Sequence, residues 1–176
     1  MKKLIDTLKN IWSIDELRKR IVYTLLLILI YRVGSYVVLP GINPQILALE
    51  GSQEGLLGLF NMFAGGSFSR ASIFALGVMP YISASIVVQL LGAVIPSIQK
   101  LRTEGESGQK KMNQMTRYLT VAITGGQAAG YVVYLNQSPG AVIENSFIFW
   151  ITTVFILTAG TMFLVWLGER ITDNGI

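Results

Sequence analysis

Two side chains that many enzymes use for catalysis are missing from this sequence. It contains no cysteine and no histidine, which excludes a thiolate nucleophile, a Ser/His pair and a zinc site built from the usual nitrogen and sulfur ligands. It also lacks a G-x-x-x-x-G-K-[ST] loop that could hold nucleotide phosphates. We therefore expect a protein that is not an enzyme and that has no cofactor and no metal site.

Two polar residues, one charged and one neutral, lie within long stretches that are largely apolar. Inside a membrane such groups are costly and often functional. Arg32 could extend to a membrane interface, pair with Glu50 or Glu54, or face a water-filled cavity, and the sequence does not decide among these. Gln127 could join a functional contact, although a hydrogen bond between helices is the commoner role of such an amide.

An isoleucine pair, Ile82 and Ile86, lies four residues apart and shares one face of any helix that contains it. The serines between them point elsewhere, and we expect Val88 to face lipid. On pattern alone, ordinary packing explains such a pair.

The composition indicates a membrane protein, because 52% of the 176 residues are hydrophobic and only 14% are charged. About 20 residues at ~1.5 Å each cross the hydrocarbon core, and backbone there must satisfy its own hydrogen bonds, which favours helices. The charged residues cluster between four long apolar stretches. The sequence therefore predicts an all-α polytopic membrane protein with four membrane helices, at 21–39, 73–95 (bent at Gly77 and Pro80), 117–136 and 147–168.

The basic residues indicate the orientation of these helices. All but two of the 14, Arg32 and Arg70, lie on one side of the predicted membrane, and the positive-inside rule makes that side cytoplasmic. We expect cytoplasmic segments at 1–20, 96–116 and 169–176 and external segments at 40–72 and 137–146.

Residues 1–20 repeat apolar side chains at helical spacing among lysines, which is typical of an amphipathic helix on an anionic membrane surface; a solvated lead-in is the alternative. Residues 40–72 contain a short apolar piece flanked by glycines, which predicts either a surface flap or a helix half-inserted into a protein-lined cavity. The loop at 96–116 mixes basic and acidic residues, so we expect no sequence-specific binding of nucleic acid.

Five blocks of the sequence resemble the SecY family, whose members form the pore of the Sec protein-translocation channel. The most distinctive block is SRASIFALGVMPYISASI at 69–86. The others, in chain order around it, lie at 31–42, 60–66, 104–111 and 160–176. The resemblance covers nearly the whole chain and is weakest over 1–20 and 136–146.

The resemblance implies a fold and a set of site residues. The family fold is a ten-helix channel of two inverted halves, to which this chain would contribute four helices and a short plug helix as a fragment. Ile82 and Ile86 would belong to the apolar ring that narrows the pore. Residues 57–67 would form the plug, in particular Leu57, Leu59, Phe60, Asn61, Met62, Phe63, Gly65 and Gly66. The lateral gate would include Ser85, Val87, Gln89 and Gln127.

The resemblance also implies a function and partners. The channel would move secretory polypeptides across the bacterial plasma membrane and release membrane helices sideways into lipid, as a multi-pass protein with a cytoplasmic N-terminus. Its partners would be the SecE and SecG subunits, the SecA motor ATPase or a translating ribosome, signal sequences, nascent polypeptides and membrane lipids.

Two other classes of function can be compared with this expectation. Half of a secondary transporter for small solutes would also contain broken helices, but it should have a polar site at mid-depth, where this chain offers little besides Arg32 and Gln127. An intramembrane protease needs a Ser/His pair or two aspartates within the membrane. Asp6 and Asp15 lie outside the predicted helices.

Overall fold

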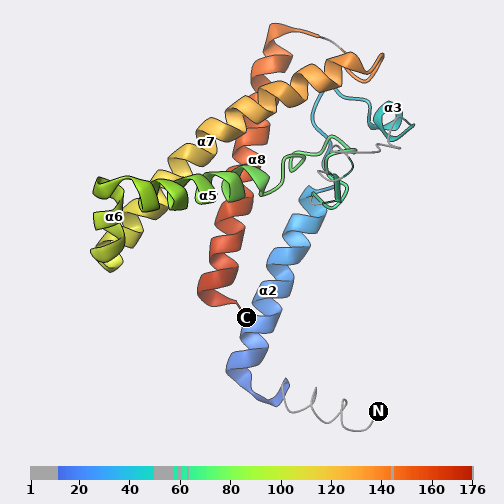
Figure 1. Ribbon diagram of the computed structural model, residues 1–176. Coiled ribbons are helices and arrows are strands. Elements are labelled where there is room, and N and C mark those ends of the chain that lie inside the picture. Colours follow the sequence, from blue (N-terminus) through green and yellow to red (C-terminus); the bar gives the residue numbers. More distant parts are fainter. Residues whose placement is uncertain (1–11, 50–57, 59–60, 63, 144, 176) are drawn as a thin grey trace.

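The computed structural model describes residues 12–49, 58, 61–62, 64–143 and 145–175, most of which are helical (Figure 1). Within these ranges no strand forms, and the chain pairs only at two isolated bridges, Val38 with Ser72 and Ile42 with Val142. The helices are α2 (Asp15–Gly34), α3 (Pro44–Leu49), α5 (Met79–Val94), α6 (Pro96–Thr103), α7 (Glu106–Gln137) and α8 (Phe147–Asn174).

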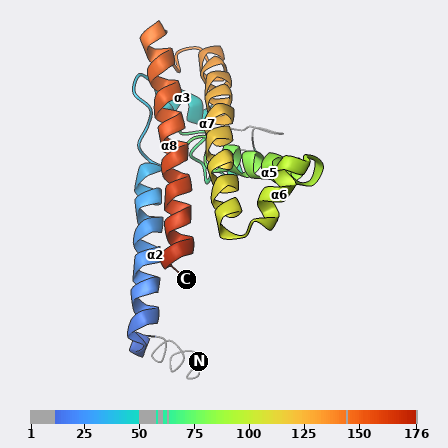
Figure 2. The ribbon, with the colours of Figure 1, turned by 90° about the vertical axis from the view of Figure 1, so that its left-hand side faces the viewer.

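The long helices pack along one another at their apolar faces. α7 and α8 are successive and lie side by side, while α2 runs along the C-terminal half of α8 (Figure 2). Leu27 of α2 is buried there with Leu164 and Leu167 of α8. α5 extends sideways from this pair and packs on α7.

The first two predicted helices are shorter than the sequence indicated. The residues expected at the end of the first and at the start of the second bond to each other instead of continuing the helices. α2 stops at Gly34 rather than at 39, and α5 starts at Met79 rather than at 73. Residues 37–39 instead pair with residues 71–73: the Leu39 N–H donates to the Ala71 carbonyl at 2.9 Å, and the Ile73 N–H donates to the Val37 carbonyl at 2.9 Å. These bonds satisfy polar groups that a helix would otherwise have satisfied internally.

The predicted bend of a helix at Pro80 is wrong, because the helix begins only at Met79. Pro80 lies in the first turn of α5, where its missing N–H disrupts no helical bond. The sharp change of direction comes earlier, at Gly77, whose positive φ of 58° suits glycine. A second break lies at Ile95, which is extended before Pro96, as residues before proline tend to be, and α5 meets α6 there at 101°.

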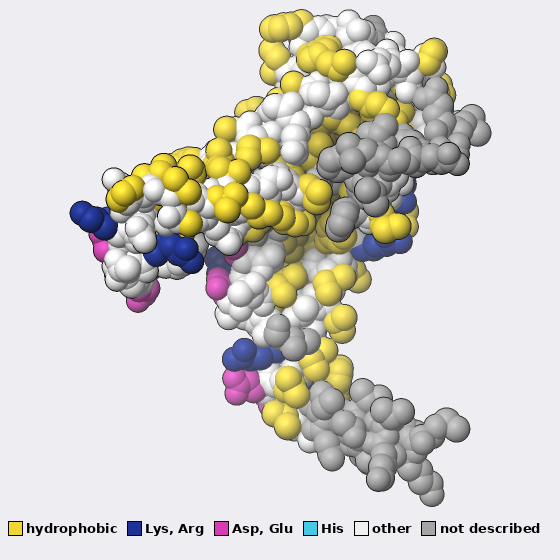
Figure 3. Space-filling view, in the orientation of Figure 1, with side chains coloured by type: hydrophobic (Ala, Val, Ile, Leu, Met, Phe, Trp, Pro, Cys, Tyr) yellow, Lys and Arg dark blue, Asp and Glu magenta, His cyan; other side chains and the backbone are white. Residues whose placement is uncertain are grey.

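The other two predicted membrane helices, 117–136 and 147–168, lie within longer helices. α8 begins at 147 as expected and continues to Asn174. α7 ends one residue past the predicted 136 but starts at Glu106, and α6 precedes it, so much of the expected cytoplasmic loop at 96–116 is helical. Charged side chains gather on α6 and its turn into α7, while the surface beside them is largely apolar (Figure 3).

By length and hydropathy, α8 is the one helix of the described residues that could cross a membrane unaided. The bent pair of α5 and α6 passes the same test when taken together. α2 begins with a charged turn, and α7 begins with charges and carries Thr, Gly and Gln further on. The helical architecture is therefore established, while the number of four membrane helices stays a prediction.

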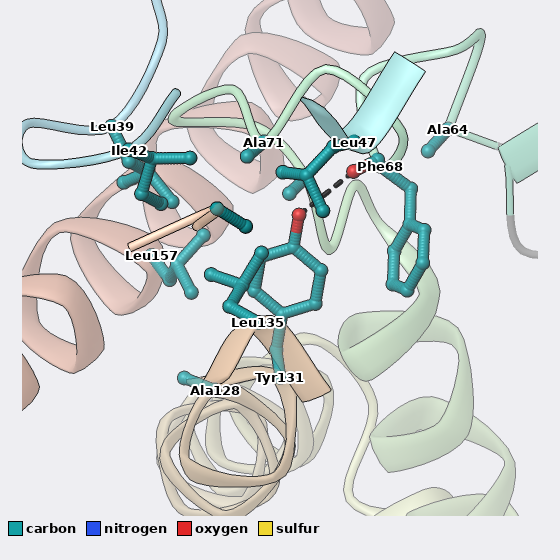
Figure 4. Packing of buried hydrophobic residues seen from close by; sticks show 12 residues of the cluster. Leu39, Ile42, Leu47, Ala64, Phe68, Ala71, Ala128, Tyr131, Leu135 and Leu157 are labelled. Atoms are coloured by element: carbon teal, nitrogen blue, oxygen red, sulfur yellow. Dashed lines mark hydrogen bonds between the residues drawn. The ribbon is translucent and has the colours of Figure 1, made fainter. Parts of the chain in front are cut away.

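The main apolar cluster forms where the non-helical segments meet α7 and α8. Phe68 and Ala71 from the segment before α5 pack with Tyr131 and Leu135 of α7 and Leu157 of α8 (Figure 4). This cluster fixes the segment that precedes α5, and with it the start of the helix that carries the isoleucine pair.

Candidate functional site

The predicted pore residues Ile82 and Ile86 lie on a face of α5 that the described residues leave uncovered. Their exposed fractions are 44% and 51%. The opposite face repeats small residues every four positions: Ala84, Val88 and Gly92 are buried, and a Cβ on Gly92 would lie 3.9 Å from the Met112 side chain of α7. We call the uncovered side the Ile82 face.

The expectation that Val88 faces lipid is wrong. Its side chain is 2% exposed because it belongs to the buried face with Ala84, four residues before it. Apolar character alone did not distinguish the two faces of α5, because both are apolar.

A cleft of about 650 Å³ opens beside the start of α5. Its apolar wall includes Ile82 and Leu164, and its polar wall includes Asn113, Arg117 and Asp173. Ile82 thus lies where an apolar surface meets a hydrophilic opening built from α5, α7 and α8.

An ion pair connects the two long helices beside this cleft. Arg117 of α7 donates from Nε to Glu169 Oε1 at 3.1 Å and from Nη2 to Oε2 at 2.6 Å. Paired donors of this kind match a carboxylate in both distance and direction. The pair fixes how α7 and α8 are aligned at the polar end of the cleft.

Only part of the predicted plug falls in the described residues. Leu57, Leu59, Phe60 and Phe63 lie outside them. Asn61 and Met62 are described, and Met62 is exposed. Gly65 and Gly66 have positive φ values of 59° and 78°, a conformation that glycine adopts more readily than other residues.

Hydrogen bonds close the end of the predicted plug and the residues that follow it into a compact turn. The Gly66 N–H donates to the Asn61 carbonyl at 2.9 Å, and the Ser69 N–H donates to Asn61 Oδ1 at 3.1 Å. We call residues 61–72, of which 63 is not described, the turn segment.

Tyr131 of α7 binds this turn segment, a contact that the sequence reading missed. Its hydroxyl donates to the Phe68 carbonyl at 2.7 Å (Figure 4). A signal was available: a tyrosine in the middle of an apolar stretch needs a partner for its hydroxyl when it is buried. The partner's identity depends on a contact between residues 63 positions apart, which local pattern does not reveal.

The predicted lateral-gate residues lie in two places. On α5, Gln89 Nε2 donates to Ser85 Oγ at 3.1 Å, and Val87 is exposed. Gln127 of α7 lines a separate pocket of about 210 Å³, together with Phe68, Leu76, Met79, Tyr131 and others. None of the three α5 residues lines that pocket, so the described residues do not bring the predicted gate set together.

Arg32 binds an aromatic ring in this structure. Its Nη2 donates to the Tyr36 hydroxyl at 2.9 Å, and its guanidinium lies 5.0 Å from the Tyr36 ring centroid. Arg70 approaches the same ring at 4.7 Å. The carboxylates considered as partners, Glu50 and Glu54, lie outside the described residues.

Comparison with known proteins places this chain beside one family. The family model for SecY matches residues 72–176. Protein translocase subunit SecY of Buchnera aphidicola subsp. Schizaphis graminum is 46% identical over 182 residues, covering 100% of this chain and 42% of the relative. The subunits of that name from Escherichia coli K12 (46% identical) and Pseudomonas aeruginosa PAO1 (48% identical) each match 93% of this chain, over 38% and 37% of their own lengths. The chain thus spans about 40% of the length of these relatives.

Proposed function

We propose that this chain, which belongs to the SecY family, forms part of a protein-conducting channel that carries unfolded polypeptide across or sideways into the membrane. The relatives named protein translocase subunit SecY support this role. No feature of the described residues favours the alternative of a small-solute transporter. The channel subunit is not itself an enzyme, and energy would come from the SecA ATPase or a translating ribosome.

The observation that carries this proposal is the Ile82 face of α5. Ile82 and Ile86 project from the helix while the opposite face packs on α7, and Ile82 borders a polar cleft. An apolar constriction at the end of a hydrophilic opening stops ions by dewetting. It also yields to a passing peptide without binding it by charge. Ile82 and Ile86 would form part of this ring.

Residues 57–67 would act as the plug of this pore. The turn segment, which overlaps their C-terminal part, supports the assignment, because hydrogen bonds and two glycines with positive φ give the chain a defined turn there. Ser85, Val87, Gln89 and Gln127 would contribute to the lateral gate, completed by the part of the channel that this chain does not include.

The remaining parts of the proposal concern location and assembly. The protein would be a multi-pass component of the bacterial plasma membrane with the 1–20 segment and the α6–α7 turn in the cytoplasm, where the basic residues lie. SecE and SecG would be its companion subunits. Signal sequences and nascent polypeptides would be its substrates.

Reconstitution tests the function directly. The complete channel, in proteoliposomes with SecE and SecG, should move a secretory precursor into a protease-protected space when SecA and ATP are supplied. Vesicles without the channel provide the control. Uptake of small solutes with no protection of the precursor would refute the proposal in favour of the transporter class.

A further inference from the structure

Two arginines from different parts of the chain approach the same tyrosine ring at the end of α2. The Arg32 guanidinium lies 5.0 Å from the Tyr36 ring centroid, and the Arg70 guanidinium lies 4.7 Å from it. Arg32 is in the last turn of α2, whereas Arg70 belongs to the segment before α5, which meets that end of α2 (Figure 1). The fold therefore gathers two positive charges at one place.

Within the described part of the chain, neither charge has an acidic partner. None of the ion pairs formed by the described residues includes Arg32 or Arg70. The negative end of the α2 dipole offsets part of the charge of Arg32, but Arg70 lies outside that helix. Because like charges close to one another repel, an anion placed beside both arginines would be favoured.

Both side chains also keep hydrogen-bond donors for a ligand. A guanidinium carries several N–H donors. Arg32 Nη2 donates to the Tyr36 hydroxyl at 2.9 Å, and Arg70 Nη2 donates to the Gly65 carbonyl at 3.1 Å. Arg32 and Tyr36 are exposed and Arg70 is half-buried, so the group is held in place and still open to a ligand.

An apolar stripe of α2 leads away from the two arginines. Leu25, Leu29 and Val33 follow one another every four residues and therefore share one side of the helix. Their exposed fractions are 58%, 62% and 60%. A ligand that suits both features has a phosphate at one end, which arginine donors bind well, and an apolar chain at the other.

We propose that Arg32, Arg70 and Tyr36 bind the phosphate group of a phospholipid in the outer leaflet, with an acyl chain along Leu29 and Val33. The two guanidiniums donate to phosphate oxygens. The Tyr36 hydroxyl accepts from Arg32, so its own O–H is available to donate to the same phosphate. The choice of leaflet rests on the membrane orientation proposed above, and not on which polypeptides the channel carries.

A photoreactive amino acid at Val33 of the complete channel reports which lipid occupies the site. The channel is placed with SecE and SecG in vesicles of a phosphate-free diglycosyl diacylglycerol that contain a small fraction of phosphatidylglycerol. Mass spectrometry of the labelled peptide gives the share of adducts with each lipid. We expect the phosphatidylglycerol share to exceed its share of the bilayer by roughly ten-fold, which corresponds to about 1.4 kcal/mol. An adduct share equal to the bulk share would overturn the proposal.

Three variants show whether the arginines cause this enrichment. Arg32→Gln combined with Arg70→Gln should lower it to the bulk level, because both charges are lost. Arg32→Lys keeps the charge but lacks the paired donors, so it should lower the enrichment several-fold with less disturbance to folding. Arg170→Gln is the matched control and should leave it unchanged, because Arg170 also lies over an aromatic ring, Trp166, at 5.6 Å but is at the other end of the membrane. Full enrichment in the Gln double variant or in Arg32→Lys would refute binding by the arginine pair.

Inorganic phosphate distinguishes a bound lipid from a free anion. With phospholipid as the ligand, millimolar phosphate should reduce the enrichment no more than sodium chloride of equal ionic strength does. Complete loss with phosphate alone would assign the site to free phosphate and overturn the lipid proposal.

Precursor transport, measured separately in phospholipid vesicles, distinguishes failure of the site from failure of the proposed function. Transport by a channel that shows no enrichment refutes the lipid site and leaves the function standing. Enrichment in a channel that moves no precursor refutes the function and leaves the lipid site standing.

Discussion

Gly160 of α8 provides a sharp test of how tightly the segment before α5 packs on the long helices. A Cβ built on Gly160 overlaps the Ile73 carbonyl oxygen, and it would lie 3.2 Å from the Ile73 carbonyl carbon and 3.3 Å from Phe74 Cδ1. The obstacle is backbone, held by the hydrogen bond from the Ile73 N–H to Val37. The added methyl therefore cannot be accommodated by a rotamer change.

The expected cost of Gly160→Ala follows from this geometry. Forcing an extra carbon into a well-packed site costs about 1–3 kcal/mol, and the higher end applies because main chain must move. Alanine's better helix propensity returns at most ~1 kcal/mol. We therefore expect Gly160→Ala to lower the thermal unfolding midpoint of the channel in detergent.

Gly168→Ala is the matched control, since it lies on the same helix and an added Cβ meets no atom of the described residues within 4 Å. Its thermal unfolding midpoint should stay the same or rise slightly, because alanine adds up to ~1 kcal/mol to the free energy of unfolding through its helix propensity. Equal midpoints for the two variants would refute the close approach of α8 to residue 73.

Two further predictions concern the Ile82 face and the ion pair. Replacing both Ile82 and Ile86 by serine should hydrate the constriction and raise resting ion conductance, whereas Val88→Ser should lower thermal stability without added leak; equal leaks in bilayer recordings would mean that the isoleucines only pack. Arg117→Glu should destabilise the α7–α8 alignment by about 1 kcal/mol, because the pair is partly exposed. Adding Glu169→Arg should restore much of the loss in thermal unfolding, and additive losses would show that the two residues do not act as a pair.

Hydropathy located the helices but could not define where the first two break. The start of α8 at 147 was predictable, because an apolar run of sufficient length begins there. The ends of α2 and α5 were not, since residues 37–39 and 71–73 leave the helices to bond with each other across a long stretch of chain. An apolar run shows that a segment is buried, but not that it is helical throughout.

The candidate site shows a similar division. The spacing of Ile82 and Ile86 placed them on one face, and the structure leaves that face uncovered. The burial of Val88 and the contact of Tyr131 with Phe68 depend on where α7 lies relative to α5 and the turn segment. Such relations between distant segments were not encoded in any local motif.

The central claim is that the Ile82 face lines a path for polypeptide. The most direct measurement places a photoreactive amino acid at Ile82 in the complete channel, in membranes that hold a stalled secretory chain, and repeats it at the buried Val88. We expect an adduct to the translocating chain from position 82 and none from position 88. Labelling of lipid alone from position 82 would show that this face of α5 points outward and would refute its place in a polypeptide path.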